Sequence, residues 1–69
     1  MLKAALAHFI AARQRAAANL ENYLSNPVAI GEHPDLVGEV ITLIEELDSA
    51  SSKINTVHEL LSGMITEGE

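Results

Sequence analysis

The fold of this 69-residue chain is decided by one eleven-residue segment, Asn26-Pro27-Val28-Ala29-Ile30-Gly31-Glu32-His33-Pro34-Asp35-Leu36. The segment separates two long stretches that have the apolar periodicity of amphipathic helices. Asn26 precedes a proline, a position that disfavours helical conformation, so the first helix is expected to end there. Gly31 can supply a turn with positive φ, and Pro34 suits the first turn of a second helix. The segment therefore predicts a helical hairpin rather than one long rod.

Both flanking stretches carry residues at alternating spacings of four and three, the rhythm of a coiled-coil seam. The seam of the first stretch comprises Leu2, Leu6, Phe9, Arg13, Ala16, Leu20 and Tyr23. That of the second comprises Leu36, Val40, Leu43, Leu47, Ala50, Ile54, Val57, Leu61 and Met64. We predict an all-α fold in a single domain of residues 1–69, an antiparallel two-helix hairpin. Its helices are expected at about 2–25 and 34–62, with a loop at 26–33 and a frayed tail at 66–69. Gly63 either caps the second helix or lies within one further turn.

Composition and charge exclude several classes of function. The chain has no cysteine, which rules out disulfides and thiolate metal sites. Its net charge of -6 argues against nucleic-acid binding, which needs cations to displace phosphate counterions. Residues 1–25 carry three basic residues against one acid, whereas residues 26–69 carry nine acids against one lysine. The two halves, at +2 and -8, should therefore attract each other.

No membrane partner is expected, because no apolar run is long enough to span a bilayer. Residues 1–12 loosely imitate a signal peptide, but His8 interrupts the apolar run and Arg13 follows it. The acid-poor first twenty residues are also typical of mitochondrial transit peptides, although the same residues fit the hairpin. We therefore predict a cytoplasmic protein.

The sequence carries no recognisable catalytic or metal-binding motif. The three histidines, His8, His33 and His58, lack the spacing of metal ligands on a helix. The acidic run at residues 45–48 is typical of a solvated helix face. We expect no catalytic, cofactor-binding or metal-binding residues and no cofactor, so the protein is not predicted to be an enzyme.

Two candidate surfaces for binding another protein stand out. Val37, Ile41 and Ile44 lie beside the main seam of the second helix, and one facing helix covers only a narrow stripe. Either the first helix covers them partly and water touches the rest, or a partner does. We predict a homodimer that forms a four-helix bundle through this row. The loop is the second candidate, either as a simple turn or as a stiff recognition tip formed by Ile30, Glu32, His33 and Asp35.

The segment from Asn22 to Asp35 resembles part of small uncharacterised helical-hairpin proteins from marine environmental sequences and T4-like marine phages. Those proteins have an NPVGIGEHPD-like turn between a helix and an acidic heptad helix, and Ala29 stands here in place of a glycine. The resemblance covers about residues 20–60. It implies a phage or marine bacterial origin and nothing about catalysis.

These features lead us to expect a non-enzymatic protein–protein interaction module, an accessory or host-modulating factor of a phage or marine bacterium with an unknown protein partner. The alternative is a small structural or assembly subunit of a larger complex.

Overall fold

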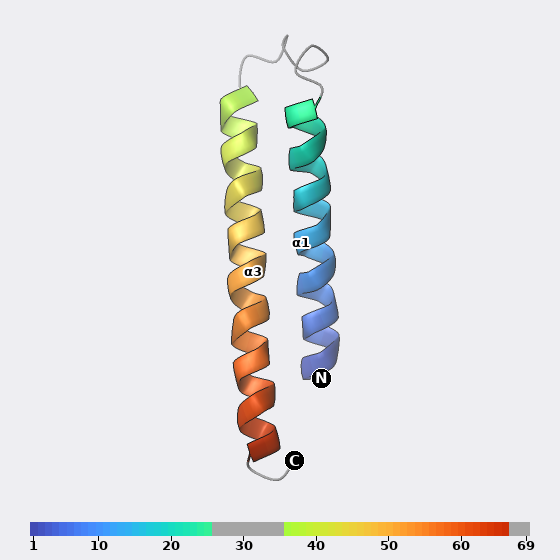
Figure 1. The fold of residues 1–69 in the computed structure, drawn as a ribbon, viewed down its shortest axis with the longest axis vertical. Coiled ribbons are helices and arrows are strands. Elements are labelled where there is room, and N and C mark those ends of the chain that lie inside the picture. Colours follow the sequence, from blue (N-terminus) through green and yellow to red (C-terminus); the bar gives the residue numbers. More distant parts are fainter. Residues whose placement is uncertain (26–35, 67–69) are drawn as a thin grey trace.

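Two antiparallel helices lie side by side in the computed structural model of the protein (Figure 1). The structure describes residues 1–25 and 36–66, and the predicted loop at 26–33 and the tail at 67–69 lie outside the described residues. Helix α1 spans Leu2–Ser25 and helix α3 spans Leu36–Thr66. The described ranges contain no strand. The predicted all-α hairpin is therefore confirmed.

The bounds of the helices agree with the prediction except at the end of α3. Helix α1 has the predicted bounds, and the predicted first residues of the second helix, 34 and 35, lie outside the described residues. Helix α3 continues four residues beyond the predicted position 62 and ends at Thr66. Gly63 is thus a residue of the helix interior rather than its cap. The last turns of α3 extend beyond the beginning of α1, as Figure 1 shows.

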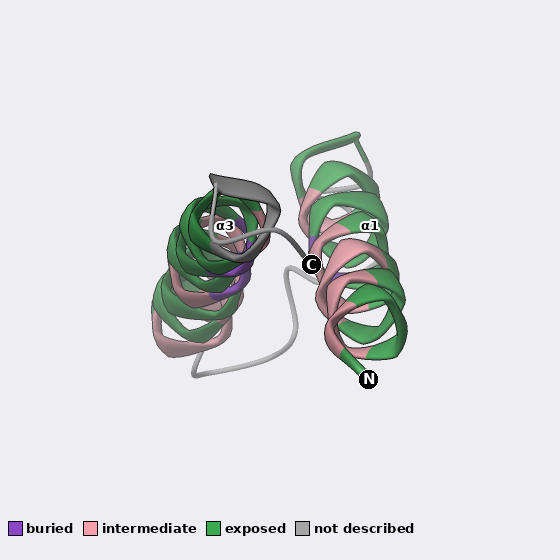
Figure 2. Cartoon of the chain, turned by 90° about the horizontal axis from the view of Figure 1, so that it is seen from below, coloured by how far each residue is buried: buried purple, intermediate pink, exposed green. Residues whose placement is uncertain are grey.

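The two predicted seams form the contact between the helices. Every seam residue from Leu2 to Tyr23 and from Leu36 to Leu61 is buried or half-buried. Burial is deepest at four positions that are at most 5% exposed, namely Ala16, Ala50, Ile54 and Val57. Figure 2 shows the buried and half-buried positions on the facing sides of the helices and the exposed positions around the outside. The alternating spacing places the seam residues on one face because a helix turns once every ~3.6 residues.

Tyr23 and Glu39 mark the register of the hairpin. The Tyr23 hydroxyl donates a hydrogen bond to the Glu39 carboxylate, so these two residues lie opposite each other near the end formed by Ser25 and Leu36. A turn centred on residue 30 would place Tyr23 opposite residue 37. Tyr23 instead meets Glu39, so the observed register differs from that of a turn centred on residue 30 by two residues.

Truncation of the core should cost far more stability than truncation of an exposed apolar residue on the same helix. Ile54→Ala removes a side chain that is 4% exposed and should lower the free energy of unfolding by about 2–4 kcal/mol. Leu60→Ala, at a side chain 51% exposed, is the matched control and should change it by less than about 0.5 kcal/mol. Urea unfolding followed by circular dichroism at one fixed protein concentration measures both. Equal losses would contradict this placement of the core.

Gly63→Ala should stabilise the protein. Alanine is favoured over glycine by about 0.8–1.0 kcal/mol in a helix interior, and a Cβ at Gly63 would meet no atom within 4 Å. We expect the free energy of unfolding to rise by about 0.5–1 kcal/mol in the same urea experiment, and the helicity measured by circular dichroism to stay the same or increase. A loss of stability would show that this position does not have helical backbone in solution.

Candidate protein-interaction surface

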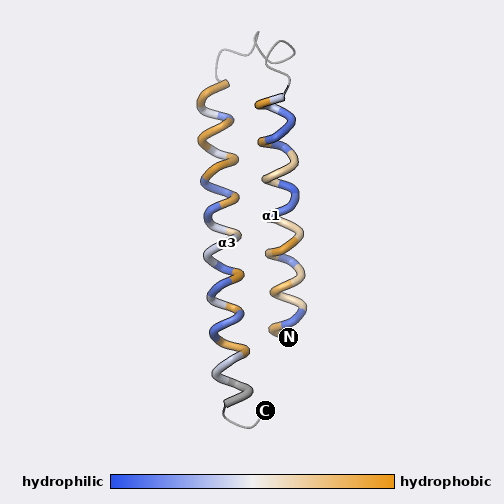
Figure 3. Tube along the Cα trace, in the orientation of Figure 1, coloured by the Kyte–Doolittle hydropathy of each residue, from blue (hydrophilic) through white to orange (hydrophobic). Residues whose placement is uncertain are grey.

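The row predicted as a partner surface is exposed. Val37, Ile41 and Ile44 are 72%, 51% and 50% exposed, so α1 leaves at least half of each side chain in water. We call these three residues the apolar row. Figure 3 shows that the first turns of α3 are more continuously hydrophobic than the turns that follow. In the isolated hairpin, α1 covers these three side chains only partly and water contacts the rest, which is the first of the two alternatives.

The apolar row lies on one flank of the hairpin, away from the side where Tyr23 meets Glu39. Successive residues of a helix are about 100° apart, which places the apolar row and Glu39 on opposite flanks of the α3 seam. Leu24 follows Tyr23 on α1 and is turned by the same angle towards the flank of the apolar row. It is 66% exposed and lies at the same end of the hairpin. We call Leu24 and the apolar row together the apolar face.

The apolar face is confined to the half of the hairpin that begins at Ser25 and Leu36. Further along the same flank of α3 come Asp48, Ser51 and Asn55, which are polar. The most buried residues of α3, from Ala50 to Val57, lie at the same levels as these polar residues but on the face towards α1. The most deeply buried part of α3 therefore lies towards the chain termini, and the apolar face lies towards the opposite end.

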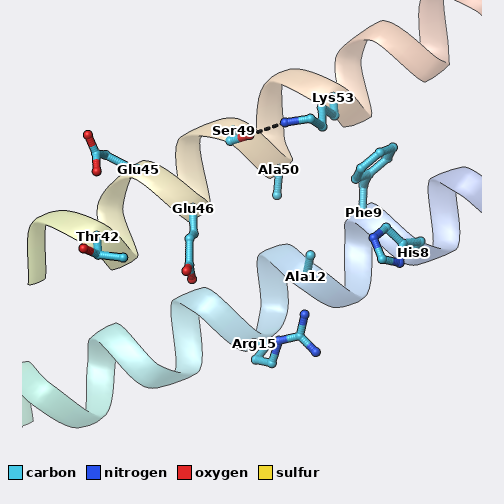
Figure 4. A pocket seen from close by; sticks show the side chains of 10 residues that line it. All are labelled: His8, Phe9, Ala12, Arg15, Thr42, Glu45, Glu46, Ser49, Ala50 and Lys53. Carbon is cyan, nitrogen blue, oxygen red and sulfur yellow. Dashed lines mark hydrogen bonds between the residues drawn. The ribbon is translucent and has the colours of Figure 1, made fainter. Parts of the chain in front are cut away.

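The opposite flank of the hairpin is polar and has two shallow hollows between the helices. The first is drawn in Figure 4 and is lined from both helices, by His8, Phe9, Ala12 and Arg15 and by Thr42, Glu45, Glu46, Ser49, Ala50 and Lys53. Arg15 of α1 and Glu45 and Glu46 of α3 are among the lining residues, and Glu45 points away from α1. Lys53 donates a hydrogen bond to the Ser49 hydroxyl on its own helix. Both hollows open widely to solvent, unlike pockets that bury most of a ligand.

The second hollow contains the contact between Tyr23 and Glu39. It is lined by Asn19, Asn22, Tyr23, Gly38, Glu39, Thr42 and Leu43. The hydrogen bond to the Glu39 carboxylate raises the pKa of Tyr23 above its ordinary value of 10.0, and desolvation and the negative charge of Glu39 act in the same direction. The Glu39 Oε2 atom is buried and has no hydrogen-bond partner among the described residues. The sequence did not reveal this contact, because it depends on a register that periodicity fixes only to within about one turn.

The described residues contain no constellation that suggests a metal site. Among residues 1–25 and 36–66, no three histidine, aspartate or glutamate side chains gather closely enough to hold a metal ion. His8 and His58 are exposed, and the His8 ring packs edge-on against Phe9 with ring centroids 5.2 Å apart. His33 and the other residues of the predicted recognition tip, Ile30, Glu32 and Asp35, lie outside the described residues. Neither described helix contains a segment both long and apolar enough to cross a membrane.

Comparison of the chain with family models, curated proteins and solved structures found no match.

The Tyr23 pKa can be measured directly, because Tyr23 is the only tyrosine and the chain has no tryptophan. Glu39→Gln removes the carboxylate and should lower the pKa of Tyr23 towards 10.0 in an ultraviolet absorbance titration. Glu46→Gln, an exposed carboxylate of the same helix, is the control and should leave the titration unchanged.

The same shift has a consequence for stability against pH. Because folding raises the pKa of Tyr23, the contact contributes to stability at pH values below 10.0 and is lost as the pH rises through the raised pKa. Glu39→Gln should therefore flatten the loss of stability at alkaline pH. An alkaline unfolding curve identical to that of the parent protein would contradict this role.

Proposed function

We propose that the protein is a non-enzymatic protein–protein interaction module that dimerises into a four-helix bundle through its apolar face. The single observation that carries the proposal is the exposure of Leu24, Val37, Ile41 and Ile44 on one flank of a hairpin with very little core of its own. Pairing two hairpins is a common way to cover such a surface.

The size of the molecule supports a partner. A chain of this length buries only about 60% of the surface that its unfolded form exposes, so small domains often gain stability by oligomerisation. The hairpin is long and thin, 55 × 15 × 14 Å, so most of its side chains lie near the surface. Covering the apolar face would therefore add to the stability of the fold as well as form a complex.

The biological role follows from the surface and the resemblance. A module of this kind acts by contact, as an accessory or host-modulating factor of a phage or marine bacterium. That origin rests on the resemblance of residues 22–35 alone.

Ile41→Glu should separate the dimer without unfolding the hairpin. Ile41 is 51% exposed in the hairpin, so the fold tolerates a carboxylate there, whereas a dimer would have to bury it without a counter-charge. We expect the parent protein to have the mass of a dimer by light scattering at micromolar concentration, and Ile41→Glu to weaken the dimer roughly 100-fold or more.

Leu60→Glu is the matched control. Leu60 is also 51% exposed on α3 but lies outside the apolar face, so its substitution should leave the dimer intact. Circular dichroism checks that both variants remain helical. A monomeric parent protein, or equal weakening by both substitutions, would overturn the proposal.

A further inference from the structure

We infer that the two copies pack with their Ser25–Leu36 ends together, so that α1 of each copy lies against α3 of the other. This inference rests on the proposed dimer and specifies its geometry. Two features of the hairpin carry it independently: the position of the apolar face along the long axis, and the unequal charge of the two helices.

Symmetry allows two ways to bring the same flank of two hairpins together. A two-fold axis parallel to the helices places the Ser25–Leu36 ends at the same end of the bundle and sets α1 against the partner's α3. A two-fold axis across the helices places those ends at opposite ends. It sets α1 against the partner's α1 and α3 against the partner's α3.

The position of the apolar face favours the parallel axis. Such an axis keeps every residue at its own level along the bundle, so Val37, Ile41 and Ile44 meet the same level of the partner while the hairpins overlap along their full length. With the axis across the helices, full overlap would place the apolar row against the polar flank that carries Asp48, Ser51 and Asn55. Apolar residues could then meet only if the hairpins slid apart and lost much of the interface area.

The charge of the helices favours the same arrangement. Helix α1 has a net charge of +2 and α3 a net charge of -4. Arg15, Glu39, Glu45, Glu46 and Lys53 lie on the opposite flank, so the acids of α3 on the flank of the apolar face are Asp48 and Glu59. Packed helices lie about 8–10 Å apart, within the ~8–10 Å screening length of physiological salt. The parallel axis sets each basic helix against an acidic one, whereas the other axis sets the two acidic helices against each other. Opposite charges across an interface fix its orientation more than its strength.

Spin-label distances between two copies distinguish the arrangements. The chain has no cysteine, so Ala4→Cys and Ser25→Cys each give a single labelling site, and both positions are exposed. They lie about 31 Å apart along α1 at ~1.5 Å per residue. With the Ser25–Leu36 ends together, each variant should give a distance between the two copies of about 20–30 Å, the width of two helix layers and the label tethers.

Opposite ends would give a different pair of distances. The separations along the axis for the two variants would then add up to at least ~60 Å, so at least one of them would be ~30 Å or more. Combined with a sideways separation of ~20 Å, this places the labels of that variant more than about 35 Å apart. That result, in a sample that light scattering shows to be dimeric, would overturn the inference and leave the dimer standing. A monomeric mass for the unlabelled protein would instead overturn the proposed function, and the orientation with it.

Discussion

The contact between two helix seams is the interaction on which the rest of this molecule depends. Within residues 1–25 and 36–66, each helix packs only against the other, so a residue becomes buried only where the two seams face each other directly. Four of these described residues are buried, namely Ala16, Ala50, Ile54 and Val57, and two of them are alanines that contribute little apolar area. The exposure of the apolar face and the case for a second copy both follow from this limited core.

Periodicity predicted the helices well, because helix geometry converts spacing along the chain into a shared face. The seam residues from Leu2 to Tyr23 and from Leu36 to Leu61 are all buried or half-buried, as the spacing predicts. The apolar row could also be predicted from the sequence. Val37, Ile41 and Ile44 are apolar residues in addition to the seam of the second helix, and one facing helix covers only that seam. The exposure of Leu24 could not be predicted from the spacing, because it depends on where α1 ends relative to α3.

Contacts that depend on register could not be predicted in the same way. The meeting of Tyr23 with Glu39 requires knowledge of how the connection sets one helix against the other to within two residues. The hollow between Arg15, Glu46 and Lys53 also depends on small residues, such as Ala12 and Ala50, facing each other across the seam. Similarly, nothing in the spacing decided whether Gly63 would end α3, because glycine is compatible with both a cap and a helix interior.

The deepest burial in α3 and the apolar face occupy different halves of the hairpin. The buried residues from Ala50 to Val57 hold the two helices together and are not exposed to a partner. Val37 and Ile41 are exposed to a partner and contribute little to the contact between the helices. Substitutions in the apolar face therefore remove few contacts within one copy and act mainly on the contact between copies. Contacts within the hairpin and contacts between hairpins can for this reason be changed separately.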